Sequence, residues 1–183
     1  MSWYREQLEQ WLSELDVSAN TVLDIGGAQG HVDRRVKNWN VKNYEVLDLP
    51  ECDIAAYGIK KNEWIVERKD TADIIFCLEV FEYLINPTLA IENISYMLKQ
   101  GGKAYITFAF IYPHHNELEF DSLRYTESGI KRFADEAGLK ITNIWYRTDK
   151  SGLLNAFYNA DGMRKAKQYD HHDVTGFIVE FTK

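Results

Sequence analysis

The stretch VLDIGGAQG at residues 22–30 decides the fold class of this chain. An apolar run that ends in Asp24 and is followed by glycines is typical of a buried strand that turns through a tight loop into a helix. Gly26, Gly27 and Gly30 let the backbone approach a ligand closely, and the amides at the start of the helix face that ligand. The stretch therefore predicts a nucleotide-type cleft at the end of the first strand.

The same stretch has two other interpretations. A dinucleotide-binding fold, as in a nicotinamide-dependent oxidoreductase, has the pattern G-x-G-x-x-G, whereas the glycines here follow the order G-G-x-x-G. Asp24, directly before the glycines, suits a ligand with an ammonium group better than one with a pyrophosphate. A plain strand, turn and helix with packing glycines is the alternative that needs no ligand.

Three further stretches follow along the chain. YEVLDL at 44–49 indicates a second strand ending in Asp48, which is placed to accept both ribose hydroxyls or, in the alternative interpretation, is a solvated loop residue. ADIIFCLEVFEY at 72–83 indicates an apolar strand that runs into a helix start. MLKQGGKAYIT at 97–107 indicates a glycine turn into another strand.

Together, in this order over about residues 20–110, the four stretches resemble the motifs of class I S-adenosylmethionine-dependent methyltransferases. The third is similar to the family's D-hhh-x-x-E-V-hh-E-H pattern, with Tyr83 where histidine is usual. The fourth is similar to its L-K-P-G-G turn, with Gln100 in place of proline. A segment from His114 to Thr126 also resembles a stretch found in small bacterial methyltransferases, many of them with unassigned or sugar-related substrates.

The alternation of strand and helix patterns predicts a single α/β domain over residues 1–183. The resemblance implies a Rossmann-like class I methyltransferase sandwich, with a mostly parallel sheet of seven or six strands and an antiparallel last strand. The expected elements are an N-terminal helix within 1–18, helices at about 30–38 and after residues 86 and 126, and strands at about 21–25, 43–47, 140–147 and 174–181. Two more strands are expected, one within 72–83 and one after the glycine turn of 97–107.

Helix boundaries follow from capping residues. Asn86 before a proline and Thr126 are typical helix N-caps, and Gly101 and Gly138 are expected to end the two helices that follow them. Residues 54–68 fit either a short third strand or a helix.

Composition narrows the class of protein and of partner. The chain has 183 residues, 45% of them hydrophobic and 27% charged, as in an ordinary globular domain. No apolar stretch is long enough for a membrane span, and the N-terminus lacks the features of a signal peptide. The net charge of −7 argues against a nucleic-acid partner. Cys52 and Cys77 show no paired spacing, so we expect reduced thiols and a cytoplasmic protein.

The resemblance assigns roles to particular residues. It implies that the cofactor is S-adenosyl-L-methionine, that the glycine loop surrounds its methionine part, and that Asp24 orients the loop and reaches the amino group. The expected cofactor-binding residues are Asp24, Gly26, Gly27, Gly30, Asp48, Leu49, Asp53 and Leu78.

The acceptor is expected at the carboxyl ends of the parallel strands, beneath the segments 111–125 and 150–173. Histidine titrates near neutral pH, so His114 and His115 are the candidates for a general base. Tyr112, Arg124 and Tyr125 are the candidates for contact with the acceptor, although Arg124 pairing with Asp121 as a loop brace is an equal alternative. No metal-ligand spacing is present.

These observations predict methyl transfer to a small-molecule acceptor, at a hydroxyl of a sugar or ring compound. The alternative is a non-catalytic module that keeps the fold and binds S-adenosylmethionine without turnover. The oligomeric state is left open.

Overall fold

The computed structural model describes residues 3–27, 38–47, 63–113, 121–154 and 173–183. Its helices are α1 (Trp3–Glu14), α3 (Glu63–Glu67), the 3-10 turn η2 (Phe81–Tyr83), α4 (Pro87–Met97) and α5 (Glu127–Glu136). Its strands are β1 (Ser18–Ile25), β2 (Asn40–Leu47), β3 (Ala72–Cys77), β4 (Leu98–Ala109), β5 (Lys140–Thr148) and β6 (Val174–Thr182). None of these described helices is long and apolar enough to cross a membrane.

The strands form one mixed sheet in the order β2-β1-β3-β4-β6-β5. β2, β1, β3 and β4 are parallel, and β6 runs antiparallel to both of its neighbours, β4 and β5. The predicted α/β sheet with an antiparallel last strand is therefore confirmed, with six strands in the described part of the chain. β1 and β3 are neighbours in the sheet, so the strands of the sequence motifs at 22–30 and 72–83 lie side by side.

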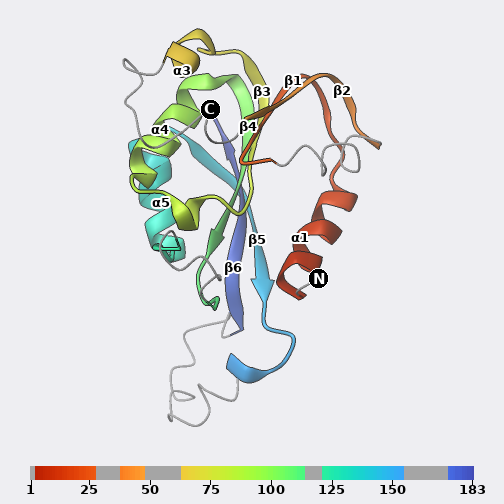
Figure 1. The fold of residues 1–183 in the computed structure, drawn as a ribbon, viewed down its shortest axis with the longest axis vertical. Helices are drawn as coiled ribbons and strands as arrows, with labels where there is room; N and C mark the ends of the chain where they lie inside the picture. Colours follow the sequence, from red (N-terminus) through yellow and green to blue (C-terminus); the bar gives the residue numbers. More distant parts are fainter. Residues whose placement is uncertain (1–2, 28–37, 48–62, 114–120, 155–172) are drawn as a thin grey trace.

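Helices cover both faces of the sheet (Figure 1): α1 lies on one face, and α4 and α5 lie on the other. On the α1 face, Leu8 and Leu12 pack near a stack of aromatic rings in which Phe76 lies between Trp39 and Tyr105, at centroid distances of 5.2 and 5.3 Å. The opposite face holds the larger core, which includes Phe81, Phe108, Ile91, Ile94, Ile130 and Phe181. Burial on both faces explains why β3 is a nearly continuous apolar run.

Both predicted N-caps are confirmed. The Asn86 side chain accepts a hydrogen bond from the Leu89 amide at 3.1 Å, and Thr126 Oγ1 accepts one from the Gly129 amide at 3.2 Å. Gly138 has φ +66° just after α5, as expected of a glycine that ends a helix. The ambiguous segment contains the short helix α3 in its described part, and Ile65 is its fully buried residue.

The prediction that Gly101 ends the preceding helix is wrong. Helix α4 already ends at Met97, because Leu98 turns to extended backbone (φ −68°, ψ 137°) and pairs with Ala72 of β3. Gly101 instead lies within β4, where its amide donates to the Lys183 carbonyl oxygen at 2.9 Å. The glycine pair thus marks an irregular strand start rather than a helix end.

Replacing Thr126 tests its role as the N-cap of α5. Thr126→Ala should lower the free energy of unfolding by about 1 kcal/mol, because the Gly129 amide loses its partner. Urea unfolding followed by circular dichroism measures the difference. Thr126→Ser keeps an acceptor hydroxyl and should remain close to the wild type; an equal loss in both variants would contradict a capping role.

Candidate functional site

The four parallel strands end together at one edge of the sheet. Ile25, the last residue of β1, lies in register between Leu47 of β2 and Cys77 of β3, and Cys77 pairs in turn with Ile106 of β4. Open α/β sheets bind ligands at the carboxyl ends of such strands, close to where the connections diverge. This edge, called the carboxyl edge below, is therefore the candidate site.

The loop after β1 folds back onto Asp24. This carboxylate is 1% exposed, and its Oδ2 accepts a hydrogen bond of 2.7 Å from the Tyr44 hydroxyl. A Cβ on Gly27 would stand 2.4 Å from the Asp24 carboxyl carbon, so only glycine fits there. Gly26 has φ +73°, and its amide donates to the Leu47 carbonyl oxygen at 2.6 Å. The Asp24 carboxylate is therefore buried directly beneath a closely packed glycine loop.

The loop after β3 contacts this glycine loop. A Cβ on Gly26 would stand 2.4 Å from Cγ2 of Val80, so the two loops touch without space for a side chain. Glu79 precedes Val80 with φ +59°, an uncommon conformation for a residue other than glycine. Its amide donates to Thr107 Oγ1 of β4 at 2.6 Å. This bond helps to fix where the Glu79 carboxylate is held.

The Glu79 carboxylate forms an ion pair with a buried arginine, Arg147. Arg147 of β5 is 1% exposed, and its Nη1 and Nη2 donate to the two Glu79 carboxylate oxygens at 2.6 and 3.4 Å. Nη2 also donates to the Tyr4 carbonyl oxygen at 2.6 Å, and the guanidinium lies over the Tyr4 ring, 3.1 Å from its centroid. Gln7 exchanges two hydrogen bonds with the Thr148 backbone. The first turns of α1 are thereby fixed to the end of β5.

Glu82 is a second acid at this edge, and its side chain is 3% exposed. Burial raises its pKa to about 8, with the nearby charge of Glu79 as the second cause and Arg147 opposing the shift. The Glu82 carbonyl oxygen accepts from the amides of Ser122 and Leu123 at 3.0 Å each, which holds the start of the following segment against η2. Burial and the charge of Glu79 thus favour the protonated form of the Glu82 side chain.

Arg124 and Asp121 form the loop brace that the sequence left as an alternative. Arg124 Nη1 and Nη2 donate to the two carboxylate oxygens of Asp121 at 2.5 and 2.8 Å, a two-point pairing of fixed geometry. Nη2 also donates to the Tyr112 carbonyl oxygen at 3.3 Å. The Tyr112 ring packs on the Tyr4 ring with centroids 4.3 Å apart, so this loop and α1 meet.

The described residues include some of the predicted site residues. Asp24, Gly26, Gly27 and Leu78 lie at the carboxyl edge, where Leu78 is 6% exposed. Tyr125 lies deeper: it is 5% exposed, and its hydroxyl donates to the Phe81 carbonyl oxygen at 2.6 Å. Its predicted contact with the acceptor stays a prediction, as do the roles of the residues outside the described ranges, namely Gly30, Asp48, Leu49, Asp53, His114 and His115.

Tyr4, Glu79, Glu82 and Arg147 are the residues of this edge that sequence reasoning did not assign. Tyr4 was expected only as part of the buried stripe of the N-terminal helix, and it does lie buried there. Glu79 and Glu82 stand inside a recognised motif, E-V-F-E-Y, and that spacing was the available signal. Arg147 carried no signal, because a single basic residue in a strand pattern is usually solvated. Within the described segments, no three His, Cys, Asp or Glu residues gather as metal ligands.

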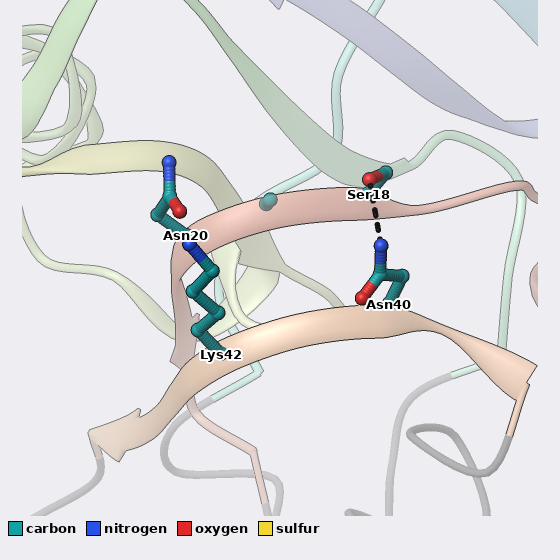
Figure 2. Close-up of a pocket in the computed structure, with 5 residues that line it drawn as sticks. Ser18, Asn20, Asn40 and Lys42 are labelled. Atoms are coloured by element: carbon teal, nitrogen blue, oxygen red, sulfur yellow. Dashed lines mark hydrogen bonds between the residues drawn. The ribbon is translucent and has the colours of Figure 1, made fainter.

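A separate hollow lies at the opposite end of the sheet (Figure 2), at the start of β1 and β2. It is lined by Ser18, Ala19, Asn20, Asn40 and Lys42. The side-chain amide of Asn40 donates to Ser18 Oγ at 3.4 Å, a long contact between exposed side chains. Because it lies at the amino ends of parallel strands, this hollow is not where an open α/β sheet places its ligand.

Comparison with known proteins decides the family. A protein-family model described as a methyltransferase domain matches residues 2–166. The chain belongs to this methyltransferase family. It is an S-adenosylmethionine-dependent methyltransferase, as the four sequence motifs predicted. A comparison with curated proteins finds no significant match.

Solved structures share the fold of this methyltransferase. The S-adenosylmethionine-dependent enzyme from Archaeoglobus fulgidus superposes with a TM-score of 0.65 at 10% identity, over 98% of this chain and 92% of that chain. One from Mesorhizobium loti superposes with a TM-score of 0.62 at 8% identity, over 98% of both chains. The putative methyltransferase in complex with the Haloferax volcanii Trm112 activator superposes with a TM-score of 0.63 at 15% identity, over 98% of this chain and 89% of that chain. At such identities the likeness concerns the fold alone.

The glycine loop fits this cofactor. A buried carboxylate lies beneath two glycines with no space for a Cβ at either, so the backbone of this loop, called the cradle below, can approach a ligand closely. The role of the buried Asp24 carboxylate as partner of the cofactor's ammonium group stays a prediction.

The cradle gives a direct test. Gly27→Ala should weaken binding of S-adenosylhomocysteine by about tenfold or more and destabilise the fold by about 1–3 kcal/mol, because the added Cβ forces the Asp24 carboxylate to move. Calorimetric titration and urea unfolding measure the two effects. Gly129→Ala is the matched control, because its Cβ would only make an ordinary contact of 3.4 Å with Thr126 Oγ1; equal behaviour of the two variants would contradict the cradle.

The buried acid predicts a pH-dependent stability difference. Folded Glu82 keeps its proton between about pH 5 and pH 8, where the unfolded chain has lost it, so this group lowers stability as pH rises through that window. Glu82→Gln removes this titration. Its free energy of unfolding, relative to that of the wild type, should therefore rise by about 1–3 kcal/mol from pH 5 to pH 8. Urea unfolding at both pH values measures it.

Glu136→Gln, on the exposed side of α5, removes a similar carboxylate and should show no such pH-dependent gain. A Glu82→Gln variant whose difference from the wild type is the same at both pH values would show that Glu82 is ionised in the folded protein.

Proposed function

We propose that this methyltransferase transfers the methyl group of S-adenosylmethionine to a hydroxyl group of a small, uncharged acceptor, a sugar or a ring compound. The observation that carries the proposal is the balance of charge among the acids of the carboxyl edge other than Asp24, which we assign to the cofactor. Glu79 is neutralised by Arg147, and Asp121 by Arg124. Burial favours the protonated form of Glu82. A site with its charges balanced in this way favours an acceptor without net charge.

Tyrosine rings support the same class of acceptor. Tyr4 and Tyr112 pack against each other at this edge, and Tyr83 of η2, which belongs to the motif at 72–83, is partly exposed. Aromatic faces pack on sugar rings and on flat rings alike, while phenolic hydroxyls bond to hydroxyl groups. Tyr112 and Arg124, with Tyr125 behind them, are the residues that we assign to acceptor binding.

The cofactor assignment combines the described cradle with predicted residues. In it, Asp24, Gly26 and Gly27 hold the methionine part with Gly30 and Leu78, Asp48 binds the ribose, and Leu49 and Asp53 lie beside the adenine. When bound, S-adenosylmethionine supplies a methyl group on a sulfonium that is already primed for displacement. The protein then has to orient the acceptor oxygen, exclude water and remove a proton.

His114 and His115 are our candidates for the group that first removes the acceptor proton. Each belongs to the segment between Tyr112 and Arg124, whose two ends lie at the carboxyl edge. This assignment rests on the position of the two histidines in the sequence and on the ordinary pKa of histidine near neutrality.

The function is tested by offering acceptors of different chemistry. Purified protein is incubated with trideuteromethyl S-adenosylmethionine and separate panels of sugars, phenols and primary amines, and products are read by mass spectrometry. We expect transfer to oxygen. His114→Ala and His115→Ala should keep the affinity for S-adenosylhomocysteine while at least one of them lowers turnover by about 10²-fold or more. Transfer to amines alone would overturn the hydroxyl acceptor.

A further inference from the structure

Glu82 has no obvious structural reason to be an acid. Its side chain is 3% exposed, and its Oε2 has no hydrogen-bond partner among the described residues. A buried carboxyl oxygen without a partner costs free energy, so its presence at a ligand-binding edge points to a partner that comes with the ligand.

Two neighbours share this feature. The Tyr4 hydroxyl and Arg147 Nε are also buried and have no hydrogen-bond partner within the described segments. Tyr4, Arg147 and Glu82 come from α1, β5 and η2, and the three side chains are close enough to interact electrostatically. Unsatisfied polar atoms on three elements around one place are evidence for an incomplete polar network.

Glu82 also follows closely in the chain after the loop that touches the cradle. It lies two residues after Val80, whose side chain occupies the space beside Gly26. In a buried environment, a positive charge held in the cradle acts on Glu82 more strongly than it would in water. A buried acid with an unpartnered oxygen therefore follows directly after the loop that touches the cradle.

We propose that Glu82 is a proton switch that follows the charge of the bound cofactor, ionised beside the sulfonium of S-adenosylmethionine and protonated beside the neutral sulfur of S-adenosylhomocysteine. The proposal rests on the cofactor assignment of the proposed function. It makes Glu82 a positioning residue that distinguishes the cofactor from its product by charge.

The surroundings of Glu82 agree with this behaviour. The titratable and charged groups that interact with it are Glu79, Asp121, Arg147, Arg124, Tyr4, Tyr83 and Tyr125. Arg147 and Arg124 are each already engaged by a carboxylate, Glu79 and Asp121 respectively, so neither is a full counter-ion for Glu82. Without an added cation, burial and the Glu79 charge keep the pKa of Glu82 high.

The switch also accounts for the proton that the reaction frees. Methyl transfer to a hydroxyl forms an oxygen–carbon bond from an oxygen lone pair, and the carbon–sulfur bond breaks with its electron pair left on sulfur. The hydroxyl proton must then leave the acceptor oxygen. Since the site loses its positive charge in the same event, Glu82 regains its affinity for a proton when one is released, whichever side chain takes it first.

Calorimetry in two buffers of different ionisation enthalpy, phosphate and Tris, counts the protons released on binding. At pH 7.0, we expect S-adenosylmethionine to release about half a proton or more beyond the number for S-adenosylhomocysteine, because Glu82 changes from mainly protonated to ionised. Glu82→Gln should abolish this difference, Glu82→Asp should retain part of it, and Glu136→Gln should leave it unchanged.

The outcomes separate the inference from the function on which it rests. Equal proton release for both ligands in the wild type, or a difference that persists in Glu82→Gln, would overturn the switch and leave the hydroxyl acceptor in place. A Glu82-dependent difference in a protein that methylates only amines would support the switch and overturn the hydroxyl acceptor. Failure of the wild type to bind either ligand would overturn both.

Discussion

The arrangement of the carboxyl edge depends on one buried ion pair. Arg147 is almost completely enclosed, and burying a guanidinium costs free energy that an opposite charge and hydrogen bonds offset. Glu79 meets the charge, and the Tyr4 carbonyl oxygen meets a further donor. Because the three partners come from the end of β5, the loop after β3 and the first turn of α1, this pair determines where all three stand relative to the sheet.

The pair also explains local features that are otherwise unfavourable. Glu79 adopts φ +59°, a conformation in which a side chain is strained. It is held there by its carboxylate on Arg147 and by its amide on Thr107. With Glu79 so placed, Val80 seals the space beside Gly26, and Glu82 is carried into the interior. The conformation of Glu79 thus helps to fix both the glycine loop and the position of Glu82.

Local sequence signals predicted the parts of the fold that depend on neighbouring residues. The apolar run before Asp24 and the capping residues Asn86 and Thr126 have a physical meaning within a few positions, and the structure confirms each. Gly101 was misread, because a glycine pair after an apolar helix is ordinarily a stop signal, whereas the strand pairing of Leu98 with Ala72 had already ended the helix. Long-range strand pairing prevailed over a local preference.

The polar network could not be predicted in this way. Arg147 and Tyr4 are 143 residues apart in the chain, and their contact exists only because β5 and α1 meet at one corner of the sheet. Nothing in the strand pattern around Arg147 distinguishes a buried guanidinium from a solvated one. Glu82 stood in a recognised motif, but its protonation is a consequence of burial and of the charge on Glu79, which only the assembled structure provides.

The central claim is that cofactor and acceptor meet at the carboxyl edge between β1, β3 and β4. A crystal structure of the complex with S-adenosylhomocysteine tests it most directly. The account predicts that the amino acid part of the ligand lies against Gly26 and Gly27, with its ammonium group toward Asp24 and its sulfur toward the loop that carries Glu82. Ligand density at the hollow between Ser18 and Lys42, or away from the glycine loop altogether, would contradict it.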